Sequence, residues 1–351
     1  MLFAQNNKGY FVELNDHAIL IARTSGPVAP FTVEEMRECP LNDPAALETV
    51  LTQLQPKKAQ SGYVHATVGI YPEKRLVRRH TLELKRVRES GYIAEVCSQQ
   101  FRIEMDKFTL SLLNAIDGTE FDTAKIGQKE VLFGGLPTEE INSIQASLLE
   151  SRIYPERLEL GSIATLGAVV NYLGFVKSKT PVLVLEIGAD TTHSFIVTAN
   201  GVEASRPIPQ GLDAMVPIVQ KELGLKDEES ARKLFYSNTF DFTGMGPLLI
   251  KKLLKELQSS IGFYEVQTGQ SVGQVLTTQL SPKLRWLDGT IAGALGITTL
   301  KLDPVPLLQA SKINIPEAQA RNVQDIRWLG VLSLMLQKNN TVHAVTAEEK
   351  K

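Results

Sequence analysis

The stretch Val182–Gly211 contains the residues whose types and spacing could do chemistry. Its segment EIGADTT, Glu186–Thr192, places an acidic residue and a glycine between two apolar runs. A carboxylate near a glycine, at a hairpin tip rich in backbone N–H groups, can hold a phosphate and its metal ion. A simpler interpretation is a hairpin in which Gly188 only supplies a positive φ angle. The local residues alone favour the simpler interpretation.

The elements that would position this segment occur twice in the chain. Apolar runs separated by tight turns predict a strand–turn–strand–turn–strand unit from Pro181 to Pro207, with an Asn-Gly pair as its second turn. Near the N-terminus, Gly9–Leu14 and Ala18–Thr24 flank Asn15-Asp16-His17, and Pro30–Cys39 supplies a third strand. The repeated layout indicates a duplicated architecture.

The composition is that of an ordinary globular protein, with 43% hydrophobic and 22% charged residues. A chain of 351 residues exceeds the usual size of one core, so we expect two domains or one split domain. The formal net charge of −2 provides no overall field that would attract nucleic acid or a membrane surface. We therefore expect no nucleic-acid partner.

Common catalytic, metal-binding and membrane motifs are missing from the sequence. The five histidines have no metal-ligand spacing, and Cys39 and Cys97 cannot form a multi-cysteine zinc site, so we expect buried, reduced thiols. Neither a nucleophile elbow nor a G-x-x-x-x-G-K-[ST] loop occurs. The N-terminus lacks the pattern of a signal peptide, and the longest apolar stretch, Ile163–Val176, is too short to span a bilayer. These observations predict a soluble, cytoplasmic protein without catalytic residues or a metal site.

The region between the two repeated units has a different character. The run Lys74–Arg88 is basic and alternates with apolar residues, which predicts a strand with a solvated basic face; an anionic partner surface is the alternative. The spacing of apolar residues over Glu89–Leu113 predicts a helix. Glu130–Leu136 is expected to be a strand that ends in two glycines, and a helix is expected to follow it.

Five motifs occur in an order that resembles one known family. They are EIGADTT (Glu186–Thr192), RPIPQG (Arg206–Gly211), LGLKDEESARKL (Leu223–Leu234), KKLLKELQSSIGFYE (Lys251–Glu265) and the segment Glu140–Leu173, EINSIQASLLESRIYPERLELGSIATLGAVVNYL. In this order they resemble the actin-like, PilM-like proteins of type IV pilus assembly and, more distantly, the cell-division protein FtsA.

The resemblance spans residues 9–336 and implies an α/β fold. Two actin-like (ribonuclease-H-like) domains would face each other across a cleft, and a small α+β subdomain would be inserted in the first. The implied first domain comprises residues 1–72 and 155–180, the inserted subdomain residues 73–154, and the second domain residues 181–338. A disordered tail is expected at residues 339–351.

In such proteins each half supplies an Asp-x-Gly hairpin that holds a phosphate and its metal ion. In the first hairpin of this chain, Glu13 stands at the Asp position, Asn15 at the glycine position and Leu20 at an expected lysine. Residues Glu186, Gly188, Ala189, Asp190 and Thr191 form the second hairpin, where glycine is kept and the acidic residue is longer by one methylene.

Two further family features are also altered. In the family, a Gly-Gly turn approaches the adenosine; the corresponding residues here, Thr277–Leu280, contain no glycine. Ala231 and Leu234 stand where the family has a glutamate and a lysine. Each lost charge-assisted hydrogen bond removes about 1.5–3 kcal/mol, whereas a micromolar ligand is bound by only about 8 kcal/mol. We therefore expect a degenerate site and no cofactor, with ATP and magnesium bound only if that site still works.

The resemblance implies a non-catalytic scaffold of a type IV pilus or type II secretion-like assembly at the inner membrane. Its partner would be the short cytoplasmic N-terminal peptide of a PilN-like membrane protein, and a homo-oligomer is left open. The expected groove lies between the first domain and the inserted subdomain, with Arg75, Arg78, Arg79 and the strand Val131–Gly135 as its walls. The chain would then be peripheral to the inner membrane through its partner, without direct insertion.

Two other functions follow from the same resemblance. One is an active actin-like ATPase, which micromolar binding of Mg-ATP would indicate. The other is an FtsA-like cell-division protein, whose relatives end in an amphipathic membrane-binding helix. The sequence TVHAVTAEEKK at the end of this chain has too few apolar residues for such a helix.

Overall fold

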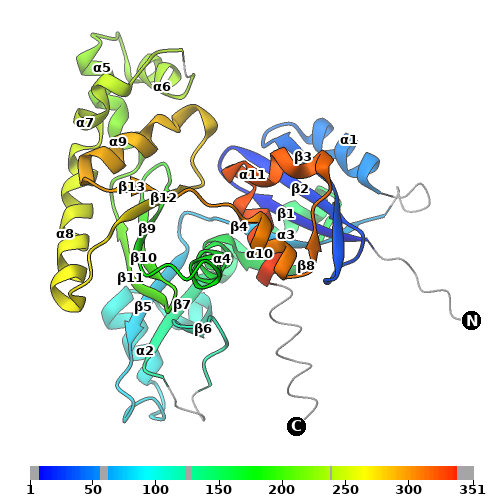
Figure 1. The fold of residues 1–351 in the computed structure, drawn as a ribbon, viewed down its shortest axis with the longest axis horizontal. Helices are drawn as coiled ribbons and strands as arrows, with labels where there is room; N and C mark the ends of the chain where they lie inside the picture. Colours follow the sequence, from blue (N-terminus) through cyan, green and yellow to red (C-terminus); the bar gives the residue numbers. More distant parts are fainter. Residues whose placement is uncertain (1–7, 56–61, 123–127, 238, 338–351) are drawn as a thin grey trace, which may run out of the picture. The chain divides into compact units, whose positions relative to one another are not determined.

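A computed structural model describes residues 8–55, 62–122, 128–237 and 239–337 (Figure 1). The expected tail, residues 339–351, lies outside the described residues. The chain divides into two compact units. The first unit comprises residues 1–172 and 303–351, and the second unit comprises residues 173–302.

The first unit is built on a six-stranded sheet with the order β14-β3-β2-β1-β4-β8. Strands β1, β2 and β3 form an antiparallel meander, whereas β4 and β8 continue the sheet in parallel from β1. This is the strand–turn–strand–turn–strand unit predicted from the apolar runs. The strands are β1 (Gly9–Leu14), β2 (Ala18–Thr24), β3 (Phe31–Pro40), β4 (Val64–Ile70), β8 (Ile153–Leu160) and β14 (Ile313–Asn314).

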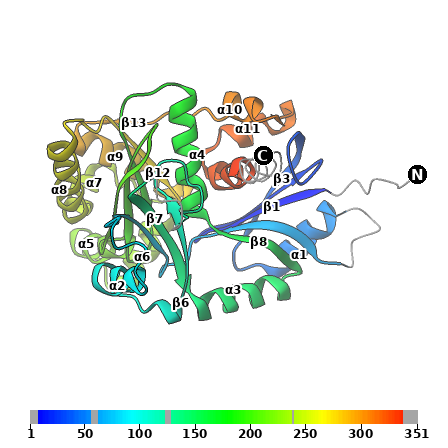
Figure 2. The ribbon, with the colours of Figure 1, turned by 90° about the horizontal axis from the view of Figure 1, so that it is seen from below.

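Helices cover both faces of this sheet, which explains why its central strands are apolar without alternation. Phe11 and Leu20 face a core that includes Ala164 of α4, whereas Val12 and Ile21 face the opposite core. Figure 2 shows α4 and α3 on opposite sides of β8. The covering helices are α1 (Pro44–Leu54), α3 (Thr138–Glu150), α4 (Gly161–Phe175), α10 (Val305–Ala310), α11 (Ala320–Gln324) and helical residues 329–337.

Residues 303–337 pack on the first unit, whereas the sequence-based boundaries assigned them to the second domain. Strand β14 pairs in parallel with β3, and Leu308, Trp328 and Met335 lie in the same core as Phe11. Because contacts so distant in sequence are set by tertiary packing, local patterns do not reveal this return of the chain.

The inserted region forms a small sheet with the order β5-β7-β6, comprising β5 (Leu76–Thr81), β7 (Glu130–Pro137) and β6 (Phe108–Asn114). Helix α2 (Tyr92–Val96) and a π-helical turn at Cys97–Phe101 complete it. The prediction of a helix over Glu89–Leu113 is therefore wrong for its second half. Leu110 and Leu112 alternate with Thr109 and Ser111, and the strand buries its leucine side against the core of this sheet.

The second unit repeats the meander in a five-stranded sheet with the order β11-β10-β9-β12-β13. Gly201, in the Asn-Gly turn between β10 and β11, has a φ of 122°, which explains the need for glycine there. The strands are β9 (Val182–Ile187), β10 (Thr192–Thr198), β11 (Gly201–Ile208), β12 (Gln274–Thr278) and β13 (Thr298–Thr299).

The helices of the second unit pack on this sheet around one large core. They are α5 (Val216–Glu222), α6 (Glu228–Ser237), α7 (Gly246–Leu249), α8 (Lys251–Thr268) and α9 (Trp286–Leu295). Among the described residues of both units, no helix combines the length and the apolar character that crossing a membrane requires.

Candidate functional site

The hairpin between β1 and β2 is closed by one of its own side chains. The Oδ1 atom of Asn15 accepts hydrogen bonds from the amides of His17, at 3.0 Å, and Ala18, at 2.9 Å. The Asn15 amide donates to the carbonyl of Ala18 at 3.2 Å. Three backbone N–H groups at this tip, those of Asn15, His17 and Ala18, are therefore already bonded within the hairpin.

Glu13 is buried below this tip, with 1% of its surface exposed. Its Oε1 accepts a hydrogen bond from Asn15 Nδ2 at 3.3 Å. On the other side its carboxylate lies against Gly330, where a Cβ atom would overlap both Oε2 and Cδ. The carboxylate is thus part of the packing between β1 and the helical residues 329–337.

The hairpin between β9 and β10 is more open. Gly188 donates its amide hydrogen to the Thr191 carbonyl at 3.0 Å, and the carbonyls of Gly188 and Ala189 accept the amides of Leu212 and Asp213 at 2.9 Å. The amides of residues 189–191 make no hydrogen bond within the described parts of the chain. This tip therefore keeps three backbone donors that no described residue satisfies.

Gly188 does not have the positive φ that the simpler interpretation of this hairpin required. Glycine fits here because a Cβ would lie only 3.1 Å from the Thr191 carbonyl oxygen. Glu186 is buried in β9, opposite His193 of β10 and Thr278 of β12. Asp190 is exposed at the tip.

The other residues at which this chain departs from the family pattern lie in the cores of the two units or in a strained turn. Leu20 and Ala231 are fully buried among apolar side chains, and Leu234 packs on the same core as Ala231. Gln279, within the segment expected to replace the Gly-Gly turn, has a φ of 60°. The chain therefore keeps a glycine-like conformation at this turn but adds a side chain.

Sequence reasoning missed a polar cluster at the end of β12. Arg285 Nη1 donates to the Thr277 carbonyl at 3.2 Å and to Asp288 Oδ2 at 2.9 Å, and the Thr277 hydroxyl donates to Asp288. The spacing Arg-x-x-Asp at the start of a helix is the signal that could have indicated it. The cluster fixes the loop from β12 to α9.

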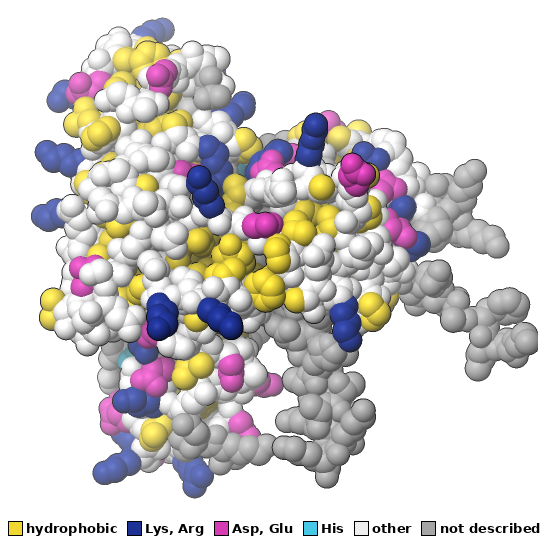
Figure 3. All heavy atoms as spheres, viewed as in Figure 1, with side chains coloured by type: hydrophobic (Ala, Val, Ile, Leu, Met, Phe, Trp, Pro, Cys, Tyr) yellow, Lys and Arg dark blue, Asp and Glu magenta, His cyan; other side chains and the backbone are white. Residues whose placement is uncertain are grey.

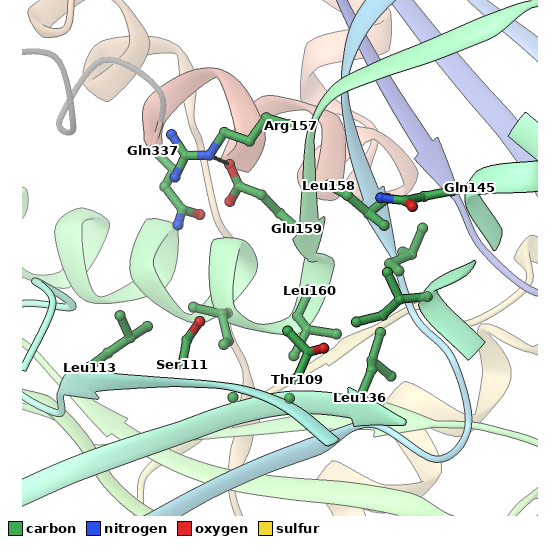
Figure 4. A pocket seen from close by; sticks show the side chains of 15 residues that line it. Thr109, Ser111, Leu113, Leu136, Gln145, Arg157, Leu158, Glu159, Leu160 and Gln337 are labelled. Carbon is green, nitrogen blue, oxygen red and sulfur yellow. Dashed lines mark ion pairs between the residues drawn. The ribbon is translucent and has the colours of Figure 1, made fainter. Parts of the chain in front are cut away.

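A pocket of about 390 Å³ lies in the first unit, between the inserted sheet and the six-stranded sheet. Figure 4 shows Thr109 and Ser111 on one side of it, with the β8 side chains opposite. Most of its lining is apolar. The lining residues are Ile70, Thr109, Ser111, Leu113, Gly134, Gly135, Leu136, Ile141, Gln145, Arg157, Leu158, Glu159, Leu160, Ile163 and Gln337.

The pocket has one charged end and a floor that depends on glycine. Arg157 Nε lies 2.5 Å from Glu159 Oε1, and Gln337 stands beside this ion pair (Figure 4). A Cβ on Gly134 would overlap Ile163, and one on Gly135 would overlap β6. The two glycines thus allow β7 to approach both α4 and β6.

None of the three arginines predicted as groove walls lines this pocket, whereas Gly134 and Gly135 do. Arg75 donates to Ser162 Oγ at 2.9 Å and to the carbonyls of Tyr71 and Pro72, so it fastens the inserted region to the start of α4. Arg78 and Arg79 lie on β5, on the opposite side of β7 from β6. Contact of these arginines with a partner stays a prediction.

Within the ranges that the structure describes, no three His, Cys, Asp or Glu side chains are placed to hold a metal ion. Glu13 and Glu186, the acidic residues of the two hairpins, belong to different units.

Two α/β units, each with an antiparallel meander extended by parallel strands, define the class: this is an actin-like fold, as the sequence predicted. Among solved structures, the PilM–PilN type IV pilus biogenesis complex is similar, with a TM-score of 0.67 and 16% sequence identity. The match covers 95% of this chain and 99% of that one. The resemblance to PilM-like proteins is therefore confirmed for the fold.

Two more distant similarities are to an actin-like ATPase-fold protein of unknown function and to a secretion protein. The first, from Bacteroides thetaiotaomicron, has a TM-score of 0.43 at 9% identity and covers 89% of this chain and 97% of that one. The second is the cytoplasmic domain of EpsL, an inner-membrane component of the type II secretion system of Vibrio cholerae. It has a TM-score of 0.39 at 8% identity and covers 78% of this chain and 84% of that one. No family model and no curated protein matches the sequence.

Proposed function

We propose that this protein is a cytoplasmic scaffold of a type IV pilus or type II secretion-like machine at the inner membrane. It would bind a short cytoplasmic peptide of a PilN-like membrane partner in the pocket of the first unit. The observation that carries this proposal is the pocket itself, which lies between the inserted sheet and the main sheet, where the resemblance places the peptide groove.

The strands around the pocket favour an extended ligand. Both β6 and β8 are outer strands of their sheets, and side chains of both line the pocket. An outer strand offers backbone donors and acceptors to an added strand, and neighbouring apolar depressions select its side chains. On β6, the carbonyl of Leu112 already accepts the amide of Phe121 at 2.9 Å, so the available edge is Phe108–Ser111.

The chemistry of the lining restricts the ligand further. A volume of about 390 Å³ lies in the range that holds a ligand rather than a single water molecule. Most of the wall would accept apolar side chains, and the Arg157–Glu159 pair would accept a polar group at one end. A mostly apolar peptide with one polar side chain fits this wall.

The non-catalytic part of the proposal is supported by the first hairpin, where Asn15 Oδ1 accepts the amides of His17 and Ala18. A buried Leu20 stands at the position where the resemblance implies a lysine, and this further supports a role without nucleotide binding. The open amides at residues 189–191 favour one second candidate function, residual phosphate binding, and hence an actin-like ATP-binding protein.

The peptide proposal is tested by filling the pocket from an exposed position. Ser111 is exposed on β6 and lines the pocket, so Ser111→Trp should block it without disturbing the core. Lys107→Trp, just before the same strand, is the matched control. The probe is a synthetic peptide of the cytoplasmic N-terminus of the membrane protein encoded beside this chain, measured by fluorescence anisotropy.

Ser111→Trp should weaken peptide binding about tenfold or more, and Lys107→Trp should leave it unchanged. Equal affinity for the wild type and Ser111→Trp would refute the pocket as the binding site. Calorimetry with Mg-ATP is expected to give no micromolar binding. A micromolar affinity that is lost on changing residues 189–191 would support the second candidate instead.

A further inference from the structure

One face of α8 is exposed along its whole length. Lys252, Lys255, Ser259, Phe263 and Val266 follow each other at intervals of three or four residues and therefore lie on one side of the helix. We call these five residues the outer stripe. Leu253, Leu257 and Tyr264, on the opposite side, are buried in the core of the second unit.

The two ends of the outer stripe differ in chemistry. At its C-terminal end, Phe263 is 67% and Val266 88% exposed, which is high for apolar side chains. At its N-terminal end Lys252 and Lys255 are exposed, together with the neighbouring Lys251. Figure 3 shows Lys and Arg side chains along the upper part of the edge that α8 forms, and hydrophobic ones at its lower end.

The charge of this face is not neutralised within the described residues. No ion pair involves Lys251, Lys252 or Lys255 there. The two acidic residues of α8 are engaged elsewhere: Glu256 pairs with Arg206 at 2.6 Å, and Glu265 accepts the Val272 amide at 3.0 Å. The face therefore offers three positive charges beside two exposed apolar side chains.

We propose that the outer stripe is a peripheral docking surface for an anionic membrane. The lysines would lie among anionic headgroups, and Phe263 and Val266 would enter the interface between headgroups and acyl chains. Charge complementarity selects an anionic surface, and the exposed apolar end favours a lipid interface over nucleic acid, whose phosphates would leave Val266 in water. This surface is separate from the pocket of the first unit, and its role does not depend on peptide binding.

The full-length chain is tested by co-sedimentation with vesicles of phosphatidylcholine alone and of phosphatidylcholine with 30% phosphatidylglycerol. Lys252→Gln/Lys255→Gln should weaken binding to the anionic vesicles about 25-fold, because each of the two lysines near such a surface contributes about fivefold. Phe263→Ser/Val266→Ser should also weaken it. Lys179→Gln/Lys283→Gln removes the same charge from exposed positions elsewhere in the second unit and should have little effect.

Three results would overturn the proposal. The first is that the wild type does not bind the anionic vesicles. The second is that the Lys179/Lys283 control loses as much vesicle binding as Lys252→Gln/Lys255→Gln does. The third is that the stripe variants bind vesicles normally but change the oligomeric state in sedimentation velocity. The last result would identify a second copy of the chain as the occupant. Peptide affinity of the pocket, measured on the same variants, should stay unchanged, so that the two proposals fail independently.

Discussion

The closed first hairpin makes a quantitative prediction for Asn15. Its Oδ1 accepts two backbone amides, and its Nδ2 donates to Glu13. A net hydrogen bond contributes about 0.5–1.5 kcal/mol, so Asn15→Ala should lower the free energy of unfolding of the first unit by about 2 kcal/mol. In a unit of roughly 200 residues this corresponds to a Tm lower by about 4–8 °C.

The assay is differential scanning calorimetry, because two units can unfold in separate transitions. Asp190→Ala, at the exposed tip of the other hairpin, is the control and should stay within about 0.5 kcal/mol of the wild type. Asn15→Asp keeps an acceptor for both amides but places a second carboxylate beside Glu13. It should therefore also be less stable than the wild type. If Asn15→Ala is as stable as the wild type, the amides are satisfied in another way and the reasoning is wrong.

Two further predictions concern the inserted sheet and the packing of Glu13. Burial lowers the pKa of the His80 imidazole below 6.5, so between that lowered pKa and 6.5 the unfolded chain binds more protons than the folded one. The free energy of unfolding should therefore be highest above about pH 6.5 and fall as the pH drops below that value. His80→Phe should remove this fall in melting curves recorded over the same pH range. A dependence of Tm on pH that is the same in the variant as in the wild type would contradict the prediction. Gly330→Ala should destabilise by about 1–3 kcal/mol in urea titrations, although alanine favours helix, because its Cβ overlaps the Glu13 carboxylate. Combination with Glu13→Ala should recover part of the loss, and a stabilising Gly330→Ala would show that the overlap is absent.

The parts of the fold that were predictable are those fixed by local chemistry. The antiparallel meanders follow from apolar runs separated by Asn-Asp-His and Asn-Gly turns, and the order of motifs identifies the fold class. Strand β6 was not predicted because its leucines also fit a helical spacing, and only pairing with β7 decides between the two. The return of residues 303–337 to the first unit depends on contacts with β3 and Phe11, which no local pattern encodes.

The candidate site was predictable in residue type but not in geometry. The sequence located both hairpins and the altered residues Asn15 and Leu20, yet it could not show that Asn15 bonds the amides of its own turn. The sequence predicted a groove beside the Gly134-Gly135 strand with the basic run as its other wall, and a pocket does adjoin these two glycines. The side chains opposite them in this pocket come from β8, whereas Arg75 donates to Ser162 and β5 lies on the far side of β7 from β6. No local pattern indicates which strand lies opposite the glycines.

The two hairpins satisfy the polar groups of their turns in different ways. A turn built to hold a phosphate leaves backbone donors that must find other acceptors or face water. In the first hairpin, Asn15 Oδ1 accepts the amides of His17 and Ala18, and the Glu13 carboxylate is packed against Gly330. The second instead anchors its carbonyls on the amides of Leu212 and Asp213, and the amides of residues 189–191 make no hydrogen bond within the described residues. Both arrangements are compatible with the proposed scaffold, which would have to fold without ATP.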